Sequence, residues 1–85
     1  MKQFCYTIKD KNGIHARPAG TLVKLCKEFQ SEIQITGKQG TASLKQLFAL
    51  LGLNIQCGDE VTVTAEGPDE DDAVRKIRKL MTENF

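Results

Sequence analysis

Apolar and polar residues alternate in short stretches along the chain, and the spacing of the apolar positions changes several times. From Phe4 to Lys9 every second residue is apolar, which predicts a strand with one buried face. Asn12-Gly13 then indicates a turn. From residue 16 to about residue 28 the apolar side chains recur at helical intervals, which predicts a helix with one buried side.

The middle of the chain predicts a β-hairpin followed by a short helix. Ile33 and Ile35 alternate with polar neighbours, two glycines bracket a loop, and residues 41–44 resume an extended pattern. The segment Leu47–Leu51 is apolar on nearly all sides and is closed by Gly52. We therefore expect a short helix here, with two or three of its residues in the core and the others exposed.

The last part of the chain predicts one strand and one longer helix. Residues 61–66 alternate in the manner of a strand after the Gly58-Asp59 turn. Gly67 and Pro68 end this strand, and Asp69 is the expected N-cap of the final helix. Acidic residues at the start of this helix and basic residues after them suit the helix dipole. Its expected inward residues are Ala73, Val74, Ile77, Leu80 and Met81.

The predicted elements follow the order strand, helix, strand, strand, helix, strand, helix. Because every strand is apolar on one side only, helices are expected to cover one face of a single sheet. This pattern predicts a two-layer α/β (α+β) sandwich with an open sheet face. The chain contains no internal repeat, low-complexity tract or linker, so we expect one domain over residues 1–85.

Composition excludes several classes of protein. The chain carries 12 Lys and Arg against 11 Asp and Glu, whereas nucleic-acid-binding domains usually show a clear basic excess. No apolar run approaches the length of a membrane span, and no signal-peptide pattern follows the start, so we expect a cytoplasmic protein. Cys5, Cys26 and Cys57 are widely spaced and are expected to be reduced thiols. We expect neither a metal nor a cofactor, because one histidine with scattered acids is not a ligand cluster.

The single histidine, His15, is the strongest candidate for chemistry. Pro18 is tolerated only in the first turn of a helix, which places His15 at or beside the N-cap. Free backbone N–H groups at Ala16 and beyond, together with the helix dipole, attract an anion there. A neutral imidazole is a nucleophile towards phosphorus, and the forked donors of Arg17 match phosphoryl oxygens. For a histidine and an arginine alone, however, a surface cap is the more common role.

The sequence Gly-Ile-His-Ala-Arg-Pro-Ala-Gly at residues 13–20 resembles the active-site motif of the HPr family, the histidine-containing phosphocarriers of the bacterial sugar phosphotransferase system. The stretch from Leu44 to Phe48, the strand around residues 58–67 and the Asp69-Glu70 helix start are similar to that family as well. The resemblance implies a four-stranded antiparallel sheet with three helices on one face. It also implies a monomer without a cofactor, which is acted on by partner enzymes and is not an autonomous enzyme, although it is sometimes grouped with the transferases.

The same resemblance implies roles for individual residues. Enzyme I, charged by phosphoenolpyruvate, would phosphorylate His15 on Nδ1, and sugar-specific IIA domains would accept the group. Arg17 would stabilise the phosphoryl group, with Ala16, Arg17 and Pro18 forming the phosphate-binding helix start. The partner-binding residues would be Gly20 and Lys24 of the first helix with Leu47, Phe48 and Leu51 of the short helix. Close packing is the alternative explanation for Gly20.

One position departs from the family pattern. Many members carry a serine at position 46 that a dedicated kinase phosphorylates, whereas this chain has Gln46, so no regulatory serine is expected there. Ser43 and Gln46 also fit a capping box, which would start the short helix about three residues earlier. We favour the later start, because Leu44 continues the strand alternation.

Two other functions remain as alternatives. An HPr-like regulatory adaptor would bind a transcription factor or an enzyme without an obligatory phosphoryl relay, and the presence of His15 argues against it. A sandwich that binds RNA or a small effector through its open sheet face would need exposed aromatic or basic residues there. Thr62, Thr64 and Glu66 provide neither.

Overall fold

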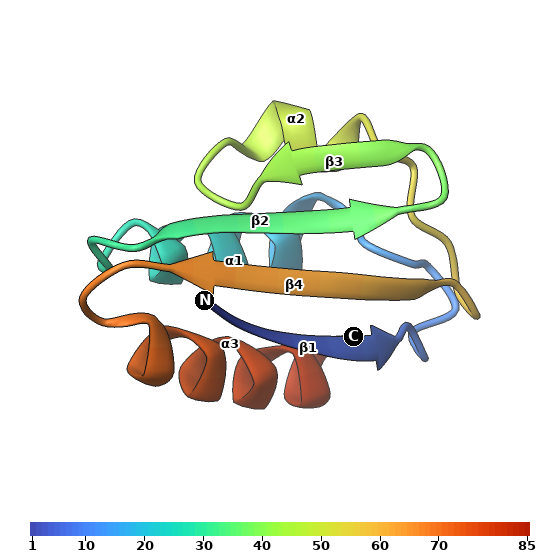
Figure 1. The fold of residues 1–85 in the computed structure, drawn as a ribbon. Coiled ribbons are helices and arrows are strands. Elements are labelled where there is room, and N and C mark those ends of the chain that lie inside the picture. Colours follow the sequence, from blue (N-terminus) through green and yellow to red (C-terminus); the bar gives the residue numbers. More distant parts are fainter.

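A single four-stranded sheet forms one layer of the computed structural model, which describes residues 1–85. Its strands are β1 (Lys2–Thr7), β2 (Glu32–Gly37), β3 (Gly40–Ser43) and β4 (Glu60–Glu66), in the order β1-β4-β2-β3. Every neighbouring pair is antiparallel. The last strand of the sequence therefore lies inside the sheet, between β1 and β2 (Figure 1).

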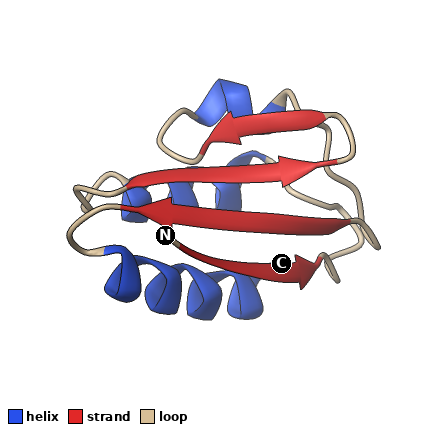
Figure 2. Ribbon diagram, viewed as in Figure 1, coloured by secondary structure: helices blue, strands red, loops and turns tan.

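Three helices form the second layer on one face of the sheet (Figures 1 and 2). They are α1 (Ala16–Cys26), α2 (Leu47–Leu51) and α3 (Glu70–Asn84). This arrangement confirms the predicted fold class and element order. None of the three helices combines the length and the apolar character needed to cross a membrane.

The predicted end of the first helix, near residue 28, is wrong by two residues. Regular helix ends at Cys26, and the chain then tightens. The N–H of Glu28 donates to the oxygen of Leu25 and the N–H of Phe29 donates to that of Cys26, both three residues back. Such bonds close tighter turns than the α-helix and commonly finish a helix.

The strand alternation sorts the side chains onto two faces as expected. Val63 of β4 lies between Phe4 of β1 and Ile35 of β2, and all three are buried against the helices. The opposite face bears Gln3, Cys5, Thr7, Glu32, Gln34, Thr36, Thr41, Ser43, Glu60, Thr62, Thr64 and Glu66. None of these side chains is aromatic or basic, so the open face lacks the stacking and phosphate-binding groups that RNA recognition requires.

All three cysteines are free in the structure. Cys26 lies in the core, and burial raises the pKa of its thiol to about 12. A thiol with this pKa is almost entirely protonated near neutral pH and is therefore a poor nucleophile. Cys5 and Cys57 are exposed.

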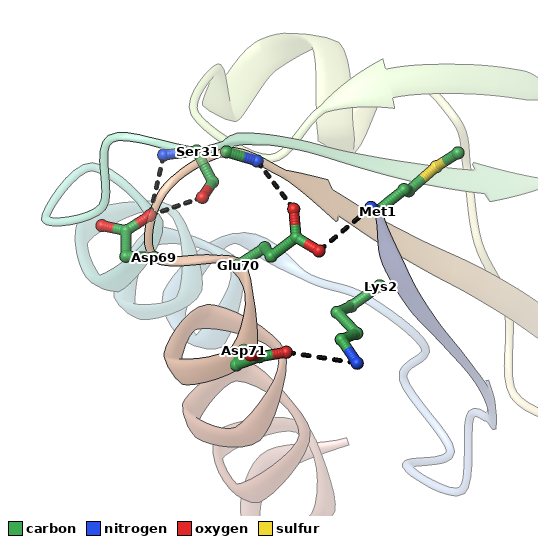
Figure 3. Close-up of polar contacts among 7 residues, drawn as sticks. Met1, Lys2, Ser31, Asp69, Glu70 and Asp71 are labelled. Carbon is green, nitrogen blue, oxygen red and sulfur yellow. Dashed lines mark hydrogen bonds and ion pairs between the residues drawn. The ribbon is translucent and has the colours of Figure 1, made fainter.

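Asp69 occupies the predicted N-cap position of α3, but its side chain does not cap the helix. Instead, the carboxylate accepts hydrogen bonds from the Ser31 N–H (3.0 Å) and the Ser31 hydroxyl (Figure 3). It also accepts one from the Gln30 N–H at 2.9 Å. The hydrogen bond from that hydroxyl is the largest cause of the lowered pKa of Asp69. Asp69 therefore ties the start of α3 to the loop before β2, a contact 38 residues away in sequence that local pattern does not reveal.

The residue after Asp69 connects α3 to the first strand. One oxygen of Glu70 accepts a hydrogen bond from the Gly67 N–H (3.1 Å), and the other lies 3.0 Å from the Met1 ammonium (Figure 3). Lys2 and Asp71 form a second, exposed pair at 3.4 Å. These contacts fix the N-terminal end of α3 beside β1.

Candidate functional site

His15 is the residue immediately before α1, in the extended conformation expected of an N-cap. One hydrogen bond and one glycine conformation fix the backbone that leads to it. The Ile14 N–H donates to the Ile55 carbonyl at 3.0 Å, and Gly13 adopts a φ of +66°. A Cβ on Gly13 would lie 2.3 Å from that same carbonyl oxygen, so only glycine fits here. The loop therefore delivers His15 to the helix start with little freedom.

The start of α1 has the features of an anion-binding position. His15 makes no side-chain capping bond, which is contrary to the surface-cap role considered for it. The N–H groups of Ala16 and Arg17 lie in the first turn, where no helix carbonyl can accept from them, and Pro18 has no N–H. Two free amides and the positive end of the dipole thus lie beside a His15 side chain that is 40% exposed.

Arg17 is exposed on the first turn of α1, two residues after His15. Its guanidinium forms none of the ion pairs in the structure. A free guanidinium can give two parallel hydrogen bonds to phosphoryl oxygens without first breaking an internal contact. The structure therefore brings the two predicted chemical residues, His15 and Arg17, to the same helix end.

Asp10 is a third residue at this position, and it was not among the predicted site residues. Its Oδ2 lies 3.4 Å from His15 Nε2, and its Oδ1 accepts a hydrogen bond from the Asn12 N–H at 2.9 Å. That backbone hydrogen bond is the largest cause of the lowered pKa of Asp10. The signal was the spacing Asp-x-Asn-Gly, which is typical of a turn in which an aspartate accepts from the residue two positions on.

The apolar surface of α2 is exposed to a greater extent than the sequence predicts. Only Leu50 is buried, whereas two or three of these residues were expected in the core. Phe48 is 86% exposed, and Leu47 and Leu51 are half-buried. Together these neighbouring side chains form a continuous exposed apolar surface, which favours a contact with another molecule. We call Leu47, Phe48 and Leu51 the α2 patch.

Gly20 and Lys24 lie one helical turn apart on α1, which packs against α2. Lys24 is exposed. A Cβ added to Gly20 would meet no atom within 4 Å, so close packing inside the domain does not explain this glycine. Open space at Gly20 leaves room for an approaching surface.

Replacing Gly20 with alanine is expected to stabilise the domain by up to about 1 kcal/mol, because alanine has the higher helix propensity. Urea unfolding monitored by circular dichroism measures the change. Gly67→Ala is the matched control, since its Cβ would lie 2.6 Å from the Ser31 Cα and is expected to destabilise the fold. A loss of stability in Gly20→Ala comparable to the control would show that Gly20 is a packing position.

Gln46 is the N-cap residue of α2, which begins at Leu47. The later of the two predicted starts of this helix is therefore confirmed. Ser43 ends β3, and its hydroxyl accepts from the Lys45 N–H at 3.1 Å. The capping-box start three residues earlier is therefore wrong. Gln46 is exposed and has no hydroxyl, and the absence of regulation by a serine kinase stays a prediction.

Comparison with known proteins supports the fold and identifies related proteins. The family model described as "PTS HPr component phosphorylation site" matches residues 2–83. Phosphocarrier protein HPr of Mycoplasma genitalium is 36% identical over 85 residues, which are 99% of this chain and 97% of that protein. The protein of the same name from Lysinibacillus sphaericus is 39% identical over 83 residues, 98% of this chain and 94% of its own. A solved histidine-containing phosphocarrier protein from Mycoplasma superposes with a TM-score of 0.94 at 35% identity, covering 96% of this chain and 93% of its own.

Proposed function

We propose that this chain, which belongs to the HPr family of phosphotransferase-system phosphocarriers, carries its phosphoryl group on His15. The observation that supports this position is the imidazole at the start of α1, beside two free amides and the unpaired Arg17. The chain is a phosphocarrier protein by family, and the proposal concerns which atoms do the carrying. Cys5 and Cys57 are exposed as well, but neither lies at a helix start.

The proposed transfer uses the lone pair of one imidazole nitrogen. That pair forms the new bond to phosphorus, and the bond to the donor breaks with its electron pair remaining on the donor. The amides of Ala16 and Arg17 and the Arg17 guanidinium stabilise the phosphoryl oxygens. Each exposed contribution of this kind is worth on the order of 1 kcal/mol, so the group is held without being trapped. Moderate stabilisation is what a carrier needs, because it must release the group to the next protein.

The proposed donor is enzyme I, and the proposed acceptors are sugar-specific IIA domains, as the family resemblance implies. On this proposal both dock on the α2 patch together with Gly20 and Lys24 of α1. The carrier acts as a monomer in the cytoplasm, where enzyme I meets phosphoenolpyruvate, and is a substrate of its partners. A regulatory adaptor is the less supported candidate, because the relatives named above are phosphocarriers.

One reaction tests the proposed function. The protein is incubated with phosphoenolpyruvate, magnesium and enzyme I, and any phosphate is mapped by mass spectrometry under alkaline conditions that preserve phosphohistidine. One acid-labile phosphate on His15, transferred onward when a IIA domain is added, is the expected result. A chain that binds these partners but takes up no phosphate would be an adaptor.

Phe48→Glu is expected to weaken binding to enzyme I and to a IIA domain by about tenfold or more, because it places a charge in the centre of an apolar contact. Titration calorimetry measures the affinity. Phosphorylation of His15 by a small phosphodonor such as phosphoramidate is expected to continue, since that reaction needs no docking.

Gln34→Glu is the control for this experiment. It introduces the same change of charge at an exposed residue of β2, on the open sheet face opposite the helices. Unchanged affinity of Phe48→Glu for both partners would remove Phe48 from the docking surface. A large fall in its melting temperature would contradict the 86% exposure of this side chain.

A further inference from the structure

We infer that Asp10 is a positioning residue for His15, which holds the imidazole in the tautomer with a proton on Nε2 and a free lone pair on Nδ1. The inference rests on the proposed function, since it concerns how His15 becomes able to accept the phosphoryl group. It adds a residue that lies outside the helix start and outside the sequence motif of residues 13–20.

The two carboxylate oxygens of Asp10 have different partners. Oδ1 accepts a hydrogen bond from the Asn12 N–H at 2.9 Å, and this bond closes the turn. Oδ2 is left to face His15 Nε2 at 3.4 Å. A carboxylate can only accept a hydrogen bond, so the imidazole nitrogen facing it is the one that carries the proton. The lone pair then belongs to Nδ1.

The backbone of Asp10 is held on both sides, which keeps its carboxylate beside His15. The backbone oxygen of Phe85, a residue with only 4% exposure, accepts from the N–H groups of Lys9 (2.5 Å) and Asp10 (2.8 Å). The Asp10 carbonyl accepts from the Gly13 N–H at 2.9 Å. Phe85, the residue that follows α3, thus fixes the position of the loop that carries Asp10. Because both the N–H and the carbonyl of Asp10 are hydrogen-bonded, its carboxylate is already in place before a phosphoryl donor binds.

The same contact contributes to the transfer step. When Nδ1 gives its lone pair to phosphorus while Nε2 keeps its proton, the ring gains positive charge. An anionic carboxylate beside Nε2 stabilises that charge, as the aspartate does for the histidine in Ser-His-Asp triads. Nε2 and Nδ1 are on different sides of the ring, so Asp10 faces away from the incoming phosphoryl group. The hydrogen bond from the Asn12 N–H and, to a smaller extent, the charge of Lys11 hold the pKa of Asp10 below its usual value, so the carboxylate facing His15 is ionised.

Asparagine at position 10 distinguishes positioning from a structural role. In Asp10→Asn the side-chain oxygen remains available to the Asn12 N–H, so the turn persists. The amide NH₂ then occupies the place of Oδ2 and faces Nε2 as a donor. The imidazole then accepts this hydrogen bond on Nε2 and carries its proton on Nδ1. Nδ1 therefore no longer has a lone pair with which to attack phosphorus. Asp10→Ala loses the turn bond but imposes no tautomer.

The test compares wild type, Asp10→Asn and Asp10→Ala by two measurements. Ring ¹⁵N chemical shifts of His15, recorded at about pH 9 where imidazoles are neutral, give the tautomer ratio. Rapid-quench kinetics give the rate of phosphoryl transfer from phospho-enzyme I. We expect mainly Nε2–H in wild type and a shift towards Nδ1–H in Asp10→Asn. We expect transfer to slow by about tenfold in Asp10→Asn and by about threefold in Asp10→Ala.

A purely structural role for Asp10 predicts the opposite order, because asparagine preserves the turn that alanine loses. Asp10→Asn transferring faster than Asp10→Ala, or retaining the wild-type tautomer ratio, would overturn the inference. Asp71→Asn is the matched control, since it removes the same charge at the other end of α3 from Phe85 and is expected to change neither measurement. If wild type takes no phosphate from enzyme I, the proposed function fails, while the tautomer ratios still decide the role of Asp10.

Discussion

His15→Ala is expected to take up no acid-labile phosphate from phospho-enzyme I, under conditions in which the wild type is fully labelled. The chain has one histidine, and alanine at this position has no lone pair to offer phosphorus. The loss is complete because the exposed cysteines and Arg17 do not replace an imidazole at the helix start. Mass spectrometry under alkaline conditions, supported by ³²P labelling, measures the result.

The fold of His15→Ala is expected to remain intact. The side chain is 40% exposed and forms no cap, so its removal changes stability by no more than about 0.5 kcal/mol. Thermal unfolding checks this, and the affinity of the variant for enzyme I reports whether the docking surface is preserved. Acid-labile phosphate found on a well-folded His15→Ala would reject His15 as the acceptor.

Arg17→Ala is expected to slow phosphoryl transfer by about ten- to a hundredfold, because it removes charge-assisted hydrogen bonds that are strongest as the group is exchanged. Single-turnover transfer from phospho-enzyme I to the carrier, followed by rapid quench, measures the rate. The melting temperature is expected to stay within a few degrees of wild type, since the guanidinium has no ion pair to lose.

Arg17→Lys provides the graded comparison. Lysine keeps the positive charge but loses the planar fork, so we expect an intermediate rate. Lys27→Ala removes a cation beyond the far end of α1 and is the control for a general change in charge. Wild-type rates in Arg17→Ala would make Arg17 a bystander, and equal losses in Lys27→Ala would indicate long-range electrostatics.

The strands and helices were predictable because the apolar residues of each one follow a regular spacing within that segment alone. Leu47–Leu51 was placed to the residue, since an apolar run closed by a glycine leaves few choices. The role of Asp69 was not predictable, because its partners lie 38 and 39 residues away and are brought close only by the sheet. The end of α1 was placed about two residues too late, because Lys27 and Glu28 both have high helix propensity. Helix propensity therefore does not distinguish the tighter turn at these residues from a continuing α-helix.

In the candidate site, too, the features set by neighbouring residues were predictable, and those set by distant contacts were not. Pro18 and the residues around it placed His15 and Arg17 at a helix start, and the structure confirms that position. Asp10 was missed because its approach to His15 depends on a turn whose geometry is set by contacts with Phe85 and Ile55. Gly20 was among the predicted residues, but the sequence left two explanations for it, partner docking and close packing. The empty space around it in the structure favours docking.

The position of β4 in the sheet affects the order in which the chain can fold. Its neighbour β1 is complete by Thr7, whereas β4 ends at Glu66, so β1 has no strand to pair with until most of the chain has left the ribosome. Pairings this distant in sequence slow folding, because a long loop must close before any contact forms. During that interval β1 is an unpaired strand, and its short length and its lysine limit association with other nascent chains. The loop of the proposed carrier site is bound by Ile55 and Phe85, so its contacts also cannot be completed until those residues have been synthesised.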